Sequence, residues 1–446
     1  MDDIWGTSGG VYLGYGCTNL EGPPENMSRK PVQYVGDRHL ITVGPSGVGK
    51  SRKALTPVLL SCPHWSMIVI DPSAELARAT AAHRAKYGEV YFLNAYGVQG
   101  FQRGSHNPML ALNPESELFV DDAYGLSEAI ITPNPQAREP HWPLSAQDLT
   151  TASTMYNRLK FGDIGSFNDV RKDLTKTAAA FRETIKHMRE VAIAKDWEVL
   201  EHKANRFLDI KPDDKELHSI LSTAQTETRW LDSPPIQRSL EKGFIDFASF
   251  KQSPKTVYII LPAKRIVTQA AWMKLVLTSA LQELIGDERK PKVPVLVAMD
   301  EAFQINFPAP LPVLVRYAPL ARKYGVKFWT FFQDIYQLEM CFGNPGWKSF
   351  VANTGVQQFF APTDMDTAEF ISRRAGTTAK AIPNSSYSAD LSTGLRSGSA
   401  DASFAWAEFP VFRPNDIINM DQTLVFCHKL KKTLIAFLPD PSEMKG

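Results

Sequence analysis

HLITVGPSGVGKS, at residues 39–51, carries the strongest structural signal in this chain. Its first five residues have the apolar character of a buried strand. Residues 44–51 then fit the pattern G-x-x-x-x-G-K-S in full, and a helical stretch, RKALTPVLL, follows directly. A glycine-rich loop between a strand and a helix is the context that this phosphate-binding motif requires. We therefore predict a P-loop here; the alternative is a glycine-rich turn that opens a helix without binding a ligand.

The residue types in this loop suit phosphate binding. Glycine at positions 44, 47 and 49 lets the backbone curl, so that successive N–H groups line an anion-sized nest at the positive end of the helix. Lys50 is expected to reach the β- and γ-phosphates of a nucleotide, and the Ser51 hydroxyl to bind Mg²⁺. The predicted nucleotide-binding residues are Gly44, Pro45, Ser46, Gly47, Val48, Gly49, Lys50 and Ser51.

Strand-like and helical stretches alternate on both sides of a long central block. Further strand-like runs lie at residues 67–70, 89–94, 256–261, 294–299 and 327–332, and helical stretches at 74–86 and 270–285. This rhythm predicts β-α-β units on a mostly parallel sheet. Near the end of the chain, residues 423–427 and 433–438 have the pattern of a β-hairpin.

The middle of the chain has a different character. Between residues 113 and 236, apolar residues recur three and four apart among charges, which indicates helices. We therefore predict an α/β nucleotide-binding domain in two parts, 1–112 and 237–446, split by an inserted all-α domain at 113–236. Within the second part, residues 385–403 are rich in Ser, Ala, Gly and Asp, which predicts a long mobile loop.

The composition excludes several classes of protein. Of 446 residues, 43% are hydrophobic and 22% charged, as in globular proteins rather than disordered or collagen-like ones. Lys and Arg total 49 against 48 for Asp and Glu, so a nucleic acid or an anionic membrane must meet a local patch. The four cysteines are scattered and the histidines lack metal-binding spacing, so we expect no zinc. An acidic N-terminus and the lack of a long apolar run predict a soluble cytoplasmic protein.

A P-loop needs a nearby carboxylate for its metal, commonly from the end of a neighbouring buried strand. The segment PVLVAMDE supplies two: Asp300 is expected on the magnesium side, and Glu301 is expected to orient or deprotonate the attacking water. Asp71, after the apolar run MIVI, is the competing metal-side acid. Its structural interpretation is an N-cap for the helix that follows. We favour Asp300 and Glu301, because paired acids suit hydrolysis whereas Asp-Pro suits a structural turn.

Two further residues are candidates for completing a hydrolytic site. Gln333 directly follows the apolar run KFWTFF, so its amide is expected at the same edge of the sheet as Asp300, where it can sense the γ-phosphate. Arg322 lies at a helix end before a glycine, from which it can project toward a neighbouring subunit and stabilise charge in the transition state. The structural alternative for Arg322 is a basic residue that favours a helix C-terminus.

The order of these segments resembles the type IV coupling proteins, the hexameric ATPases that connect DNA-processing complexes to type IV secretion channels during bacterial conjugation. The resemblance includes the P-loop and covers most of the α/β portion, whereas the helical block matches in position more than in residues. The other matching segments are DPSAELARATAAHRAKYGEVYFLN, HNPM, TVYIILP, AMDEAFQI, ARKYG, QDIYQLEMCFG, PTDMDTAEFISRRAGTTA and FPVFRPNDIINM.

This resemblance implies a RecA-like P-loop ATPase core that binds ATP and Mg²⁺. It assigns Lys50 and Ser51 to phosphate and magnesium, Asp300 and Glu301 to the acidic box, and Gln333 to γ-phosphate sensing. Arg322 matches the position of a trans-acting arginine finger. One departure is that the family's Asp-Pro-Lys-Gly-Glu is Asp-Pro-Ser-Ala-Glu here, at residues 71–75. A second is that the N-terminal membrane helices of most members are absent from this chain.

The implied partners are single- or double-stranded DNA, DNA-processing or effector proteins, and components of the secretion channel. The implied assembly is a homo-hexamer, monomeric in isolation, in the bacterial cytoplasm and recruited to the cytoplasmic face of the inner membrane. Two other functions stay open. One is a substrate-receptor platform with regulatory nucleotide binding, and the other is a chromosomal DNA-pumping ATPase without a role in secretion.

Overall fold

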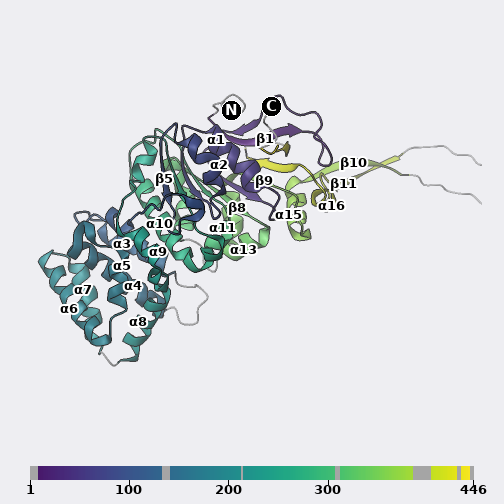
Figure 1. Ribbon diagram of the computed structural model, residues 1–446. Coiled ribbons are helices and arrows are strands. Elements are labelled where there is room, and N and C mark those ends of the chain that lie inside the picture. Colours follow the sequence, from purple (N-terminus) through teal and green to yellow (C-terminus); the bar gives the residue numbers. More distant parts are fainter. Residues whose placement is uncertain are drawn as a thin grey trace, which may run out of the picture.

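The computed structural model describes residues 9–132, 141–211, 214–306, 312–384, 403–428 and 433–441. Within them a sheet-based body carries a helical body on one side and a narrow two-stranded ribbon on the other (Figure 1). The loop predicted at residues 385–403 lies outside the described residues, except for Ser403, which begins a strand.

The core is an eleven-stranded sheet with the order β2-β1-β13-β12-β9-β3-β8-β7-β4-β6-β5. Its seven strands from β9 to β5 are parallel, and the four at the other edge pair antiparallel. The strands are β1 Val11–Cys17, β2 Val32–Tyr34, β3 His39–Val43, β4 Ser66–Ile70, β5 Glu89–Leu93, β6 Lys255–Ile259, β7 Val295–Met299, β8 Val326–Phe332, β9 Thr354–Phe359, β12 Thr423–Cys427 and β13 Leu434–Phe437. The mostly parallel sheet is therefore confirmed, as are the predicted core strands and the hairpin of β12 with β13.

The sequence did not predict β1, β2 or β9. In β1, Gly14 has φ 101° and interrupts the regular register with β2, so the strand lacks a clear two-residue alternation. In β9, two buried glutamines stand where a buried strand commonly carries apolar residues. One of them, Gln358, accepts a hydrogen bond of 3.2 Å from Thr42 of β3, so a partner on the neighbouring strand satisfies part of its amide.

Helices cover both faces of the sheet, as buried parallel strands require. Alternate residues of β4 show this: Met67 and Val69 pack in one apolar cluster with α1 and α2, and Ile68 and Ile70 pack in the other with α10. The covering helices are α1 Thr56–Ser61, α2 Glu75–Arg84, α10 Ile266–Gly286, α11 Ala302–Asn306, α12 Pro312–Ala321, α13 Ile335–Phe342, α14 Gly346–Ala352, α15 Met365–Ala375 and α16 Pro414–Ile418.

The helix after the P-loop is divided into two parts. Residues Lys50–Leu55 form a π-helical turn, and α1 then begins at Thr56. Pro57 lies in the first turn of α1, where its missing N–H has no helical partner to lose. The proline therefore starts a helix instead of bending one.

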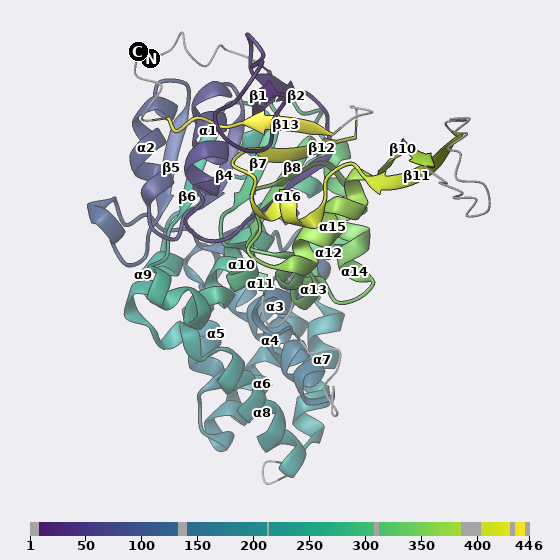
Figure 2. The same ribbon diagram turned by 90° about the vertical axis from the view of Figure 1, so that its right-hand side faces the viewer.

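Seven α-helices build the described part of the middle of the chain, which lies below the sheet in Figure 2. They are α3 Phe119–Ile130, α4 His141–Phe161, α5 Phe167–Leu174, α6 Ala178–Ala194, α7 Glu198–Asp209, α8 Lys215–Glu227 and α9 Pro234–Glu241. The long helix α4 lies at the centre, with a run of buried residues from Ser145 to Asn157. The last helix, α9, ends five positions beyond residue 236, the predicted end of the inserted domain. The division of the chain into domains stays a prediction.

The motif HNPM joins the helical body to the sheet. The His106 backbone N–H donates to the carbonyl of Ser239, and the Asn107 backbone N–H donates to that of Gly243. The two segments that connect the helical body to the sheet-based body are therefore hydrogen-bonded to each other. The His106 ring is fully buried, accepts from the Ile245 N–H at Nδ1 and contacts the Ser279 hydroxyl at Nε2. Burial lowers the pKa of His106 to about 3, so this junction uses a neutral histidine.

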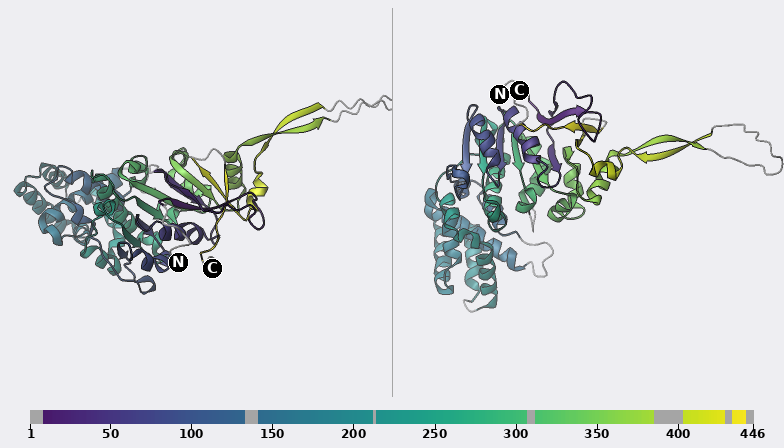
Figure 3. Two further views of the ribbon diagram at one scale, coloured as in Figure 1. Left: turned by 90° about the horizontal axis from the view of Figure 1, so that it is seen from above. Right: turned by 45° about the vertical axis from the view of Figure 1, so that its right-hand side comes forward.

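The ribbon projecting from the body consists of β10, Thr377–Asn384, and β11, Ser403–Pro410 (Figure 3). The two strands are antiparallel and paired along their whole length. The Trp406 side chain is 72% exposed on it. The ribbon follows α15 directly, so it is an extension of the sheet-based body.

Candidate active site

The P-loop lies at the carboxyl end of β3, the central strand of the eleven-stranded sheet. The Gly44 N–H donates to the Phe332 carbonyl at the end of the neighbouring strand β8, which holds the start of the loop against the sheet. Gly47 and Gly49 have φ of 85° and 84°, in the left-handed region that favours glycine. A Cβ built at Gly47 would meet nothing within 4 Å, so the loop is open on that side.

Lys50 folds over its own loop. Its side chain is 8% exposed, and Nζ donates to the carbonyls of Gly44 and Pro45 at 2.5 and 2.8 Å. Burial lowers the pKa of Lys50, while the carboxylates of Glu301 and Asp300 act in the opposite direction. A buried ammonium with two neutral loop carbonyls as partners is a strong point of attraction for an anion that enters the loop.

The acidic box contacts the P-loop directly. The Ser51 hydroxyl donates to Oδ2 of Asp300 at 2.6 Å, because only β8 separates β7 from β3 and both strands end at the same edge. Burial raises the pKa of Asp300, and the Ser51 hydrogen bond lowers it. Glu301 has φ 56°, an uncommon value for a residue other than glycine that turns the chain sharply out of the strand. The structure thus brings Lys50, Ser51, Asp300 and Glu301 together.

The competing acid, Asp71, has a structural role in this arrangement. It follows β4, which neighbours β7, and its Oδ2 accepts a hydrogen bond of 2.7 Å from the Ala77 N–H in the first turn of α2. Burial raises the pKa of Asp71 to about 6, and the nearby Asp300 adds to this shift. The Asp71 side chain therefore satisfies an N–H of the first turn of α2, although the N-cap position itself is occupied by Ala74.

Gln333 and Arg322 lie at opposite ends of β8. Gln333 directly follows the strand beside Gly44, and its N–H donates to the Gln337 side chain at 2.9 Å. Arg322 is exposed in the short turn before the strand, near His39 at the start of β3. A seven-residue strand is roughly 20 Å long, so Arg322 and the P-loop of the same chain are separated by the height of the sheet.

One contact at the site was not predicted. Arg52, next to Ser51, forms an ion pair with Asp440, which follows β13 and is 4% exposed. The end of the described chain is thus attached to the turn that carries the P-loop. The two residues are far apart in sequence, and neither belongs to a local motif that could have signalled the contact.

A family model described as type IV secretory system conjugative DNA transfer matches residues 19–431 of this chain. The chain belongs to this family. The match spans the P-loop, the helical body and the acidic box, so it covers both bodies of the fold. Within the described ranges, no helix is both long and apolar enough to cross a bilayer.

The curated relatives of this chain are distant in sequence. Conjugal transfer protein TraG of Rhizobium radiobacter is 23% identical over 88% of this chain and 60% of its own length. A TraG protein of Escherichia coli is 23% identical over 93% of this chain and 66% of its own length. The coupling protein VirD4 of Bartonella quintana is 20% identical over 81% of this chain and 56% of its own length. The chain thus spans about three fifths of the length of these relatives.

Solved structures of a bacterial conjugative coupling protein share the fold. The conjugative coupling protein TrwB in its unbound monoclinic form has a TM-score of 0.67 at 15% identity, over 90% of this chain and 85% of that one. TrwB in complex with ADP and Mg²⁺ has a TM-score of 0.66 at 15% identity, over 91% of this chain and 85% of the TrwB chain. The fold is therefore that of a RecA-like core with a mostly parallel sheet and a helical body.

Proposed function

We propose that this chain is an ATP-hydrolysing coupling protein of a type IV secretion or conjugation system. The observation that carries the proposal is the hydrogen bond between Ser51 and Asp300 beside the buried Lys50. A hydroxyl and a carboxylate in contact at the mouth of an open glycine loop form the donor set that a nucleotide with its metal requires. Family membership supports the same proposal.

The residues present fit ATP and Mg²⁺. The backbone of Gly44 to Ser51 and the Lys50 ammonium would hold phosphate groups, and Ser51 with Asp300 would hold the metal, which neutralises charge on the phosphates when bound. TrwB has been solved with ADP and Mg²⁺, and separately with a non-hydrolysable ATP analogue. These complexes of a protein with the same fold support the assignment of the loop.

The remaining site residues would act on water and on transition-state charge. Glu301 would orient or deprotonate the attacking water, since its carboxylate lies beside the P-loop but does not bond Ser51. Gln333, next to Gly44, would sense the γ-phosphate. Arg322 would act on the P-loop of a neighbouring subunit, because within its own chain it lies at the wrong edge of the sheet.

The coupling role implies DNA or nucleoprotein as cargo, with effector proteins as a second cargo class. The helical body would face this cargo, since both of its ends are anchored in the sheet-based body and it projects from one side of that body (Figure 1). The subunits would form a homo-hexamer that assembles from monomers at the cytoplasmic face of the inner membrane and contacts the secretion channel. The names of the relatives, conjugal transfer protein and coupling protein, support this placement.

DNA is expected to stimulate ATP turnover by the intact chain. A ring concentrates a few cations from each subunit, so single- or double-stranded DNA should promote assembly and raise the rate, and added salt should reverse this effect. The measurement is steady-state phosphate release with and without DNA at about 50 and 200 mM salt. A rate that does not respond to DNA would favour the substrate-receptor platform. Stimulation without any plasmid transfer between cells would favour a chromosomal DNA pump.

Glu301→Gln is expected to bind ATP normally but to lose hydrolysis. An amide keeps the shape of the side chain but cannot accept a proton, while Asp300 stays in contact with Ser51. We expect turnover to fall by about 10²- to 10⁴-fold, the usual contribution of a general base. Nucleotide binding measured by titration calorimetry should be unchanged. If binding were lost instead, the separate roles of the two acids would be wrong.

A further inference from the structure

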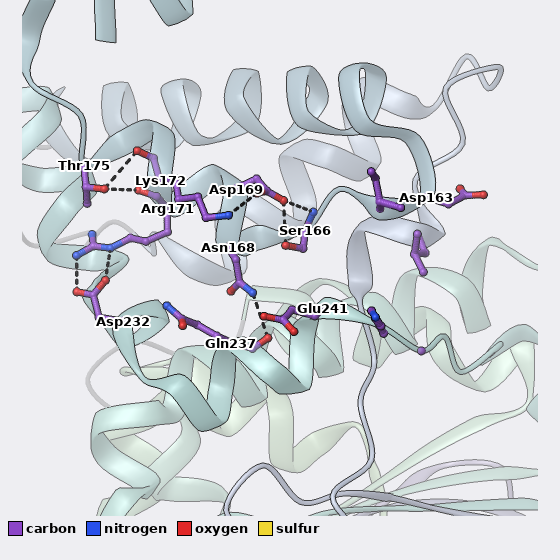
Figure 4. Close-up of a pocket in the computed structure, with 14 residues that line it drawn as sticks. Asp163, Ser166, Asn168, Asp169, Arg171, Lys172, Thr175, Asp232, Gln237 and Glu241 are labelled. Atoms are coloured by element: carbon purple, nitrogen blue, oxygen red, sulfur yellow. Dashed lines mark hydrogen bonds and ion pairs between the residues drawn. The ribbon is translucent and has the colours of Figure 1, made fainter. Parts of the chain in front are cut away.

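A hollow of about 550 Å³ lies in the helical body, with parts of α5 and α9 among its walls (Figure 4). Several of the charges that line it pair with one another. Arg171 donates to both carboxylate oxygens of Asp232, at 2.8 and 2.6 Å, and Lys172 pairs with Asp169 at 2.9 Å. These contacts are internal to the helical body. A buried polar residue of the sheet-based body, His39, instead contacts the segment that carries Arg322.

Both ring nitrogens of His39 have partners on other elements. His39 is the first residue of β3 and is 3% exposed. Its Nδ1 accepts a hydrogen bond of 3.1 Å from the Phe328 N–H in β8, and its Nε2 is hydrogen-bonded to the carbonyl of Ala318 in α12. Because Nδ1 is an acceptor, the ring proton lies on Nε2, which donates to Ala318. A neutral histidine in one tautomer therefore joins β3, β8 and α12.

The charges around His39 favour this neutral form. Burial lowers the pKa of His39, and the positive charge of Arg322 acts in the same direction. The hydrogen bond to Ala318 and the carboxylate of Asp37 act in the opposite direction. The Arg322 guanidinium is thus close enough to the ring for its charge to be felt there, although the two residues are far apart in sequence.

The backbone on both sides of Arg322 is attached to the sheet. Ala318 precedes Arg322 by four residues, about one helical turn, and α12 continues directly into the turn Arg322–Tyr324. After Arg322, its carbonyl accepts from the Gly325 N–H at 3.1 Å, and the Gly325 carbonyl accepts from the Val295 N–H of β7 at 3.0 Å. His39 holds this segment on one side of Arg322 and β7 holds it on the other, while the Arg322 side chain itself is exposed.

We propose that His39 is a positioning residue for Arg322. Through the Ala318 carbonyl it fixes the end of α12, and with it the direction in which Arg322 extends toward the P-loop of a neighbouring subunit. The proposal rests on the proposed ATPase function, in which Arg322 acts across subunits, and it adds the residue that sets the geometry. Such a role matters because a misplacement of about 1 Å can cost about 10²-fold in rate.

Two amide variants of the full chain separate the two hydrogen bonds of His39. His39→Asn keeps an acceptor near the place of Nδ1, for the Phe328 N–H, but has no atom at the place of Nε2. His39→Gln is longer and keeps a donor for the Ala318 carbonyl. We expect His39→Asn to lower ATP turnover by about 10²-fold and His39→Gln to retain most of it. ATP binding, measured by titration calorimetry, should be unchanged in both. A histidine that served only the pairing of β3 with β8 would give the reverse order of turnover.

Mixed assemblies show on which subunit the defect acts. A His39→Asn subunit keeps its own P-loop and lacks a well-placed Arg322. Mixing it with Lys50→Ala subunits, which supply an intact Arg322, should therefore restore part of the turnover. Mixing it with Arg322→Ala subunits should restore none, because neither partner supplies a working arginine. A defect transmitted along β3 to the P-loop of the same chain would give the opposite pattern and overturn the proposal.

The outcomes also separate this proposal from the one on which it rests. Normal turnover in His39→Asn, with Arg322→Ala inactive, would overturn the role of His39 alone. Normal turnover in Arg322→Ala would remove the role of Arg322 and the positioning role with it. Thermal melting of both amide variants shows whether lost turnover reflects lost folding. If His39→Asn does not fold, low turnover in a folded His39→Gln chain would overturn the proposal by itself, and retained turnover would support it.

Discussion

Lys50→Ala is expected to abolish ATP turnover and leave the chain folded. The Lys50 ammonium bonds two carbonyls of its own loop and belongs to neither apolar core cluster, so its removal costs little packing. It is, however, the buried cation of the site, and removing one preorganised charge from such a site costs on the order of 10²- to 10³-fold in rate. Lys50→Thr should behave in the same way.

Steady-state phosphate release and thermal melting, measured on the same preparation, check this prediction. The matched control is Lys86→Ala, which removes an exposed lysine just after α2 and should alter neither quantity. Normal turnover in Lys50→Ala would remove the assignment of the P-loop. A collapse of the melting temperature would instead show that the lysine supports the fold.

Arg322→Ala is expected to reduce turnover by about 10³- to 10⁵-fold, the contribution of arginine fingers in other phosphoryl-transfer enzymes. Arg322 is exposed at the amino end of β8, and the P-loop lies at the carboxyl end of the adjacent strand β3. Arg322 can therefore complete a site only at an interface where the amino edge of one subunit's sheet meets the carboxyl edge of another subunit's sheet. A head-to-tail interface of this kind generates a ring when its rotation closes.

Mixing two inactive variants distinguishes action across subunits from action within one. Rings that contain both Arg322→Ala and Lys50→Ala subunits include some interfaces in which Lys50 and Arg322 are both intact, so part of the activity should return. The control is Lys323→Ala, the exposed neighbour of Arg322, which should be active alone. Absence of recovery in rings shown to be mixed would mean that Arg322 acts within its own chain or only in the structure.

The concentration dependence of turnover gives a second view of the same interface. The isolated chain should be monomeric and nearly inactive when dilute, since each site lacks its neighbour. Specific activity should rise with protein concentration, and sedimentation should show the larger species over the same range. Constant specific activity across that range would argue against a shared site.

Local patterns were sufficient for a large part of the fold. The apolar runs of the central parallel strands and the eight residues of the P-loop are each contained in one short segment, so their structure follows from neighbours in sequence. Strands with polar or glycine-interrupted sequences were missed. Gln358 in β9 is favoured there because Thr42 on the adjacent strand contacts it, and no property of β9 alone signals that partner.

The sequence by itself determined an α/β chain with a P-loop, an acidic pair after a buried strand and a helical insertion. Only the tertiary structure decided which of these residues meet. The contact of Ser51 with Asp300 depends on the strand order β3-β8-β7, and the separation of Arg322 from its own P-loop depends on strand direction. The physical reason is that motifs and periodicity express interactions between near neighbours, whereas strand pairing and helix packing are chosen by the free energy of the whole chain.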